Sequence, residues 1–237
     1  MKRAQWNRLA DEFESEVCDI TREEVAQQVT RFVNAAKLPA KNSVLVDLGC
    51  GLGTFVAKFG DRFTRVIAVD HAQRIVARAK QLCACPSPVE WIVHDVAQIG
   101  TRIGTCADLT VCLNVITSSD PEKRAALWRS VATVTKRKGF ALVVVPSIES
   151  DELVRKMGFR AGRAAEFVAT ADGLVQRDGA VQKHYSREEL ASTLTSFGFA
   201  ARRMGRASYA WSVEGLRKPA SAGAKLPWDW ICLAQRL

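Results

Sequence analysis

The stretch Val44-Leu45-Val46-Asp47-Leu48-Gly49-Cys50-Gly51-Leu52-Gly53-Thr54 decides the fold. An apolar run that is typical of a buried strand leads directly into three glycines separated by single residues. Glycine permits unusual backbone angles and lets a ligand approach the main chain closely. The loop alone fits a tight strand-to-helix turn, or the dinucleotide-binding fingerprint, whose third glycine comes three residues after the second. Thr54 stands at that position here, and the third glycine comes one residue early.

Working outward from this loop, short apolar runs rich in Val, Ile and Leu alternate with helical patterns as far as residue 146. Strands are expected at residues 43–48, 65–69, 89–93, 108–113 and 139–145, and helices at 55–59, at 72–83 and from Asp120-Pro121 onward. This alternation predicts an α/β fold with a mostly parallel sheet and helices on both faces.

Two segments flank this core. Apolar spacing predicts a helix over residues 5–18, and the capping box Thr21-Arg22-Glu23-Glu24 opens a second one. Residues 148–184 are mixed and polar, with a hairpin expected around Asp178-Gly179. A second capping box, Ser186-Arg187-Glu188-Glu189, starts a helix to about residue 196, and two closing strands are expected at 199–210 and 228–235.

The pattern Gly-x-Gly-x-Gly with Asp47 two residues before it resembles motif I of the class I methyltransferases that use S-adenosylmethionine. The likeness is to the small-molecule (type 11/12-like) branch. It implies one Rossmann-like domain whose seven-stranded, mostly parallel sheet has its last strand antiparallel. Within residues 1–237 it implies an N-terminal helical cover (1–40), a cofactor-binding core (43–146), an inserted lid (148–185) and a closing helix with strands (186–237).

The resemblance also assigns cofactor-binding roles. The loop would cradle the methionine end and the ribose of S-adenosylmethionine, and Asp47 would hold the amino-acid portion. A carboxylate attracts the cationic ammonium and sulfonium groups of this cofactor, whereas it would repel the anionic pyrophosphate of a dinucleotide. Asp70, which ends the second strand, would accept both ribose hydroxyls, although it also fits a helix cap. The loop residues concerned are Gly49, Cys50, Gly51, Gly53 and Thr54.

Further residues follow from the same resemblance. Asp95 would accept from the adenine amino group and Val96 would cover the ring, whereas a plain turn cap is the alternative for Asp95. Asn114 ends the fourth strand and either lines the site or caps the strand end; its surroundings, Asn-Val-Ile, are not the Asn-Pro-Pro-Tyr of amino-methyltransferases. Trp6 would belong to a segment that covers the cofactor, or would simply pack a helix.

No catalytic residue is identified, because methyl transfer needs a general base only when the acceptor must lose a proton. His71, His184 and Tyr185 are the candidates, and each also fits a structural role. No metal site is expected, since Cys83-Ala84-Cys85 lacks the usual zinc spacing and the three histidines are scattered.

The chain has 237 residues, 48% of them hydrophobic, and a formal net charge of +9. With no long apolar run or signal peptide, a cytoplasmic protein, monomer or homodimer, with no membrane contact is expected. The first hypothesis is methyl transfer to O, N or S of a small molecule. The charge motivates a second, an RNA or protein methyltransferase, although the basic residues are scattered. A non-catalytic regulator that binds S-adenosylmethionine is the third, and a nicotinamide enzyme is a distant fourth.

Overall fold

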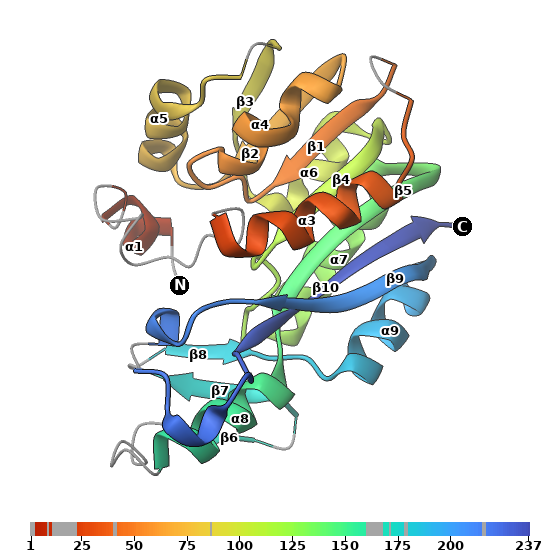
Figure 1. Ribbon diagram of the computed structural model, residues 1–237. Coiled ribbons are helices and arrows are strands. Elements are labelled where there is room, and N and C mark those ends of the chain that lie inside the picture. The colour runs from red at the N-terminus through yellow and green to blue at the C-terminus, as the bar shows by residue number, and fades with distance from the viewer. Residues whose placement is uncertain are drawn as a thin grey trace.

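A seven-stranded sheet forms the centre of the molecule, with strands in the order β3-β2-β1-β4-β5-β10-β9 (Figure 1). The computed structural model describes residues 3–8, 10, 23–39, 42–85, 87–159, 168–170, 172–177, 180–214 and 217–237. The strands are β1 (Val44–Leu48), β2 (Arg65–Asp70), β3 (Val89–Val93), β4 (Ala107–Leu113), β5 (Thr135–Pro146), β9 (Phe199–Ser208) and β10 (Trp228–Arg236). Strands β1 to β5 pair in parallel, and β10 is antiparallel to both β5 and β9. The expected sheet, with its last strand antiparallel, is confirmed.

Helices cover both faces of the sheet and bury one apolar cluster on each. The helices are α3 (Glu23–Ala35), α4 (Thr54–Phe59), α5 (Gln73–Leu82), α6 (Ile99–Ile103), α7 (Pro121–Val134) and α9 (Arg187–Ser196). Phe32 of α3 and Phe55 of α4 belong to one cluster, and Trp128 of α7 and Leu190 of α9 belong to the other. The strands between them are apolar on both sides, as buried parallel strands require.

Side-chain caps explain where two of these helices begin. The Asp120 carboxylate accepts from the backbone N–H of Glu122 and of Lys123, and Pro121 occupies the first turn of α7. The Ser186 hydroxyl accepts from the Glu189 N–H at 3.0 Å. Both starts are as expected, because these caps satisfy donors that the first turn leaves unpaired. The expected capping box at Thr21-Arg22 lies outside the described residues, as does most of the helix expected at 5–18.

The segment after β5 contains a helix that the sequence pattern does not predict. Helix α8 (Ile148–Phe159) precedes a small sheet of β6 (Val168–Ala169), β7 (Leu174–Arg177) and β8 (Ala180–Lys183). The expected hairpin is confirmed by the antiparallel pairing of β7 with β8, although Asp178 and Gly179 themselves lie outside the described residues. Helix α8 has one recognisable start signal, the Ser147 hydroxyl, which accepts from the Ser150 N–H at 3.1 Å.

The N-terminal helix and the small sheet both lie near the edge of the main sheet at which its parallel strands end. Helix α1 (Arg3–Arg8) contacts α5, and the hairpin joins the loop after β4 through an isolated bridge between Ser118 and Gln182. Figure 1 shows both flanking the edge toward which the parallel strands point. That edge therefore lies between the two segments expected to be cover and lid. No helix in the described ranges has the length and apolar character to cross a bilayer.

Candidate functional site

The glycine loop after β1 adopts a conformation that only glycine enters without strain. Gly49, Gly51 and Gly53 have φ angles of +78°, +51° and +75°. A Cβ on Gly49 would lie 2.2 Å from Val115 Cγ2, and one on Gly53 would lie 2.6 Å from the Trp91 ring. The loop is therefore fixed both by its backbone angles and by close neighbours from β3 and from the loop after β4.

Main-chain hydrogen bonds hold the loop against the end of β2. The Gly49 and Cys50 N–H groups both donate to the Val69 carbonyl, at 2.7 and 2.9 Å. The Gly53 N–H donates to the Cys50 carbonyl at 2.8 Å, and Thr54 then begins α4. The Cys50 side chain is buried, and desolvation together with Asp70 and Asp47 raises its thiol pKa well above the usual range. Cys50 thus remains a neutral thiol whose contribution to the site is its backbone.

Asp70 lies directly beneath this loop, and hydrogen bonds from two backbone N–H groups fix the orientation of its carboxylate. Its Oδ2 accepts from the Gly51 N–H at 3.2 Å and its Oδ1 from the Ala72 N–H at 2.9 Å. Burial raises the pKa of this carboxyl, and the Ala72 hydrogen bond, the nearby His71 and the Gly51 hydrogen bond offset that rise in part. Each carboxylate oxygen keeps a second lone pair, so the group can still accept from two adjacent hydroxyls.

Two further buried carboxylates lie near the same edge. Asp47 is 2% exposed and lies on β1 opposite Ala68 and Val111 of the neighbouring strands. Asp229 is 6% exposed and lies near the start of β10, opposite Pro146 at the end of β5. With Asp70, they place three buried carboxyl groups at this edge of a chain whose net charge is +9. A cationic ligand fits such a site better than an anionic one.

Asn114 connects β4 to β10 through its side chain. Its Nδ2 donates to Asp229 Oδ2 at 2.8 Å, and its backbone has a φ of +55°, which asparagine tolerates better than most residues. Its Oδ1 is buried and has no hydrogen-bond partner within the described part of the chain. Asp229 was not expected from the sequence. The available signal was a lone carboxylate between Trp228 and Trp230, in a run that is otherwise apolar as far as Ala234.

Asp95 and Val96 follow β3 at the other side of the loop. The Asp95 Oδ1 accepts from the Ala97 N–H at 2.9 Å, so this exposed side chain does cap a short helical turn, η3 (Val96–Gln98). Val96 is 4% exposed and belongs to the apolar cluster on the α7 face. The second carboxylate oxygen of Asp95 is still able to accept a further hydrogen bond.

Trp6 packs next to the loop and the end of β2. It contacts a small apolar cluster that contains Leu52 of the loop, Ala72 and Ile75. Nearby, Asn7 Oδ1 accepts from the Arg74 N–H at 3.0 Å. Helix α1 therefore lies over the residues that follow β1 and β2, which is the place expected for a covering segment.

The three candidate bases occupy different surroundings. His71 is partly exposed beside the loop, and its Nδ1 lies 3.5 Å from Asp70 Oδ1. The His184 backbone N–H donates to the Gly173 carbonyl and thus links β8 to the loop before β7. Tyr185 is buried in the cluster on the opposite face of the sheet, where its hydroxyl donates to the Ile116 carbonyl at 3.2 Å. Burial raises the pKa of Tyr185 to about 12, which fits a packing role.

Among the residues that the structure describes, no three His, Cys, Asp or Glu side chains are grouped so that they could hold a metal ion.

Comparisons with known proteins agree with this geometry. Residues 45–139 match the family model described as a methyltransferase domain, and no curated protein sequence matches the chain. The matched range contains the glycine loop, Asp70, Asp95 and Asn114. This part of the chain is therefore similar to a methyltransferase domain.

Solved structures share the fold. An S-adenosylmethionine-dependent methyltransferase from Methanosarcina mazei is 18% identical, with 86% of this chain and 97% of that one covered and a TM-score of 0.62. Magnesium protoporphyrin IX methyltransferase from Synechocystis PCC 6803, with bound S-adenosylhomocysteine, is 18% identical (90% and 81% covered, TM-score 0.58). A didemethyltoxoflavin N-methyltransferase from Burkholderia thailandensis, with its substrate and S-adenosylhomocysteine, is 15% identical (99% and 86% covered, TM-score 0.65).

Proposed function

We propose that this chain, an S-adenosylmethionine-dependent methyltransferase with the class I fold, transfers the methyl group to O, N or S of a small-molecule acceptor. One observation carries the proposal. The glycine loop follows β1, Asn114 follows β4 and Asp70 ends β2, and these three strands are parallel neighbours. Two segments outside the core flank the edge where the three strands end (Figure 1). Ligands of open α/β sheets bind beyond the carboxyl ends of the strands.

The residues present fit the cofactor. Gly49 and Gly53 pack against Val115 and Trp91 where a Cβ would clash, which holds the loop in one conformation. Glycine also leaves the main chain of such a loop open to close approach by a ligand. Asp70 is aimed by two backbone N–H groups and has lone pairs for the ribose hydroxyls. We assign the cationic amino-acid portion to Asp47, the adenine to Asp95 and Val96, and the cover to Trp6.

The chemistry required of the protein is mostly positioning. When bound, S-adenosylmethionine would supply a methyl group on a positively charged sulfur, a leaving group that keeps the electron pair of the carbon–sulfur bond while the acceptor's lone pair makes the new bond. The chain's own contribution is to align the acceptor atom and exclude water, and such alignment is worth several kcal/mol, about 7–11 in favourable cases. If the acceptor needs a base, His71 lies closest to the loop, beside Asp70.

The choice of a small molecule rests on the two flanking segments. Helix α1 contacts α5, and the β7–β8 hairpin contacts the loop after β4, so both border the edge where the acceptor would enter. A site bordered on two sides suits a small acceptor better than a wide macromolecular surface does. Two structural neighbours act, by their names, on a porphyrin and on a toxoflavin precursor, which are small molecules.

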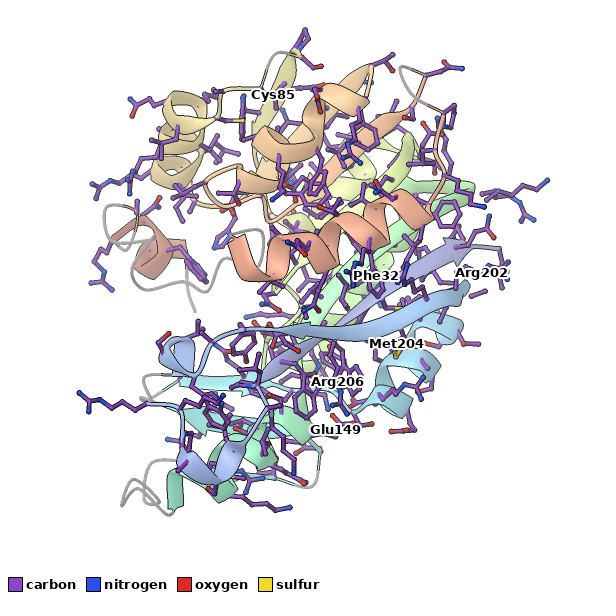
Figure 2. The ribbon with its side chains drawn as sticks, in the orientation of Figure 1. Phe32, Cys85, Glu149, Arg202, Met204 and Arg206 are labelled. Atoms are coloured by element: carbon purple, nitrogen blue, oxygen red, sulfur yellow. The ribbon has the colours of Figure 1, made fainter. Side chains whose placement is uncertain are left out.

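The RNA alternative rests on charge, and the arginines of β9 are the side chains to consider for it. Arg202 and Arg206 lie along β9, the edge strand of the sheet, with Phe32 of α3 facing it (Figure 2). The Arg202 guanidinium donates to Gln235 Oε1, and the Arg206 guanidinium stacks 4.2 Å from the Trp228 ring. These side chains are thus engaged within the fold. RNA binding that weakens steeply with salt would favour this alternative.

Calorimetry with S-adenosylmethionine and S-adenosylhomocysteine tests the cofactor first. Binding of both to the wild type, and of neither to Asp70→Ala, is the expected result; absence of binding to the wild type would contradict the proposal. A screen of small acceptors with a radiolabelled methyl group then tests the reaction. Cofactor binding with no methylated product from any small acceptor, RNA or protein would point to the regulatory alternative instead.

A further inference from the structure

A groove between α7 and α9 lies at the edge of the sheet opposite to the glycine loop. Its volume is about 450 Å³, and it is lined by Arg129, Ala132, Thr133, Ser196, Phe197, Gly198 and Arg236. Arg236 ends β10, which runs antiparallel to β5, so the end of β10 lies beside the edge where the parallel strands begin. Figure 1 shows this end of β10, marked C, on the side of the sheet away from α1. The groove is therefore separate from the site proposed for the cofactor.

The groove carries positive charge and donors without a compensating acid. No Asp or Glu is among the described residues that line it. Arg129 is exposed and forms no hydrogen bond or ion pair with any other residue in the described ranges, so all of its N–H donors are available to a ligand. The exposed Thr133 hydroxyl can add a further donor, whereas the Ser196 hydroxyl already donates to the Thr193 carbonyl at 2.8 Å.

Arg236 is the fixed member of the pair of arginines. Its Nη1 donates to the carbonyls of Phe197 and Gly198 at 2.8 and 2.9 Å, and its guanidinium stacks 5.4 Å from the Phe199 ring. The carbonyls that end a helix would repel an anion, and here this cation covers them. Nη2 and Nε make no hydrogen bond to another described residue, so they remain free to donate.

Apolar atoms form the rest of the groove wall. Phe197 is half-buried, and its ring stacks on Trp128 of α7 with centroids 6.2 Å apart. Ala132 lies one helical turn beyond Arg129 and also lines the groove. A ligand with an anionic group on the two arginines would thus rest its remaining atoms on an apolar surface. A volume of about 450 Å³ suits a small molecule, because small-molecule sites commonly measure roughly 300–1,000 Å³.

We propose that this groove binds the phosphate group of a small molecule between Arg129 and Arg236, independently of the cofactor. A guanidinium is always charged, and its planar fork of donors matches two oxygens of a phosphate. One arginine already fixed by the fold costs little side-chain entropy when the ligand binds. The free arginine can then close on the phosphate from the α7 side.

Inorganic pyrophosphate tests this site without knowledge of the natural ligand. Calorimetry should show that it binds the wild type equally well with and without saturating S-adenosylhomocysteine, because the two sites lie at opposite edges of the sheet. Arg129→Gln should weaken pyrophosphate binding about tenfold, the size of one hydrogen bond to a charged group. Lys80→Gln is the matched control: it removes the same charge from an exposed position on α5, outside the groove, and should bind pyrophosphate as the wild type does.

A second groove variant tests the fork of donors rather than the charge. Arg236→Lys keeps the positive charge and loses the planar fork, so it should also bind pyrophosphate more weakly. This variant loses contacts to the end of α9 as well, and urea unfolding shows whether it folds. If it does not, Arg129→Gln still decides the matter, because Arg129 has no hydrogen bond or ion pair to lose within the described part of the chain.

The remaining outcomes each have one meaning. No binding of millimolar pyrophosphate to the wild type, or equal affinity in Arg129→Gln, overturns the inference and leaves the proposed function standing. Displacement of pyrophosphate by S-adenosylhomocysteine also overturns it, because the anion would then lie at the cofactor edge. An RNA oligonucleotide that binds more tightly than pyrophosphate, and that Arg129→Gln and Lys80→Gln weaken equally, would indicate diffuse attraction by the net charge and would likewise overturn it. If the wild type binds pyrophosphate but no S-adenosylhomocysteine, the proposed function fails and the groove stands.

Discussion

Val115 packs so closely against Gly49 that a single added methyl group at residue 49 would lie 2.2 Å from Val115 Cγ2. The contact joins the loop after β1 to the loop after β4, two segments 66 residues apart in the chain. It therefore couples the conformation of the glycine loop to the position of Asn114, which precedes Val115.

Replacing Gly49 by Ala tests this coupling. Alanine would be strained at φ +78° and would displace Val115, so we expect a loss of about 2–4 kcal/mol in the free energy of unfolding. S-adenosylhomocysteine should also bind at least about tenfold more weakly, because the loop would move. Denaturant unfolding and calorimetry measure the two effects.

Gly104→Ala is the matched control for that experiment. Gly104 also has a positive φ, +62°, but a Cβ there would meet nothing within 4 Å. This variant should lose stability through backbone strain and keep its affinity for S-adenosylhomocysteine. Wild-type affinity in Gly49→Ala would show that the loop does not form the cofactor site.

The raised pKa of Asp70 predicts a pH dependence of cofactor binding. The ribose hydroxyls need an ionised acceptor, and burial raises the pKa of this carboxyl above that of an ordinary aspartate. Affinity for S-adenosylhomocysteine should therefore fall as the pH decreases through that raised pKa, beginning at a higher pH than an exposed aspartate would give. Calorimetry across mildly acidic pH values measures it.

Asp70→Asn supplies the comparison, because its amide does not titrate. The variant should bind S-adenosylhomocysteine weakly at every pH, and its affinity should no longer fall as the pH decreases. The same fall in the variant would mean that another group controls binding.

The sequence predicts the core of this fold better than its edges, for physical reasons. Strands β1 to β5 are apolar runs bounded by turn signals, so a short stretch of sequence is enough to predict each strand and its burial. Helix α8 was missed because its apolar side chains are few and its start depends on one hydroxyl, that of Ser147. Asp229 was missed because its partner, Asn114, is 115 residues away.

The site divides in the same way. The conformation of Gly49, Gly51 and Gly53 and the burial of Asp70 follow from local sequence, and the structure has both. Tyr185 was a candidate base because it lies in the sequence between the expected hairpin and a capped helix. Its ring instead packs edge-on against Trp128, with centroids 6.4 Å apart, a contact that depends on how α7 crosses the sheet.

Tyr185→Phe separates packing from catalysis. The change removes one buried hydrogen bond, to the Ile116 carbonyl, so we expect a loss of about 1 kcal/mol of stability. Cofactor affinity should stay the same, and once an acceptor is known the pH profile of methyl transfer should not change. A large loss of turnover with unchanged stability would instead identify Tyr185 as a catalytic base.

Lys183 and Glu189 form an ion pair whose two ends are unequally buried, and this asymmetry predicts unequal mutational costs. The side chain of Lys183 is 4% exposed and that of Glu189 is 40% exposed, with 2.7 Å between Nζ and Oε1. Glu189→Ala leaves a cation buried between the Asp172 carbonyl and the Tyr185 ring, so we expect a loss of about 1–3 kcal/mol. Lys183→Met keeps the apolar stem and leaves the Glu189 carboxylate and the carbonyl of Asp172 without the lysine. Both residues are exposed enough for water to reach them, so the cost should stay within about 1 kcal/mol. Urea unfolding of both variants and of the double variant tests this, and a greater cost for Lys183→Met than for Glu189→Ala would show that the lysine stabilises the hairpin through contacts other than this pair.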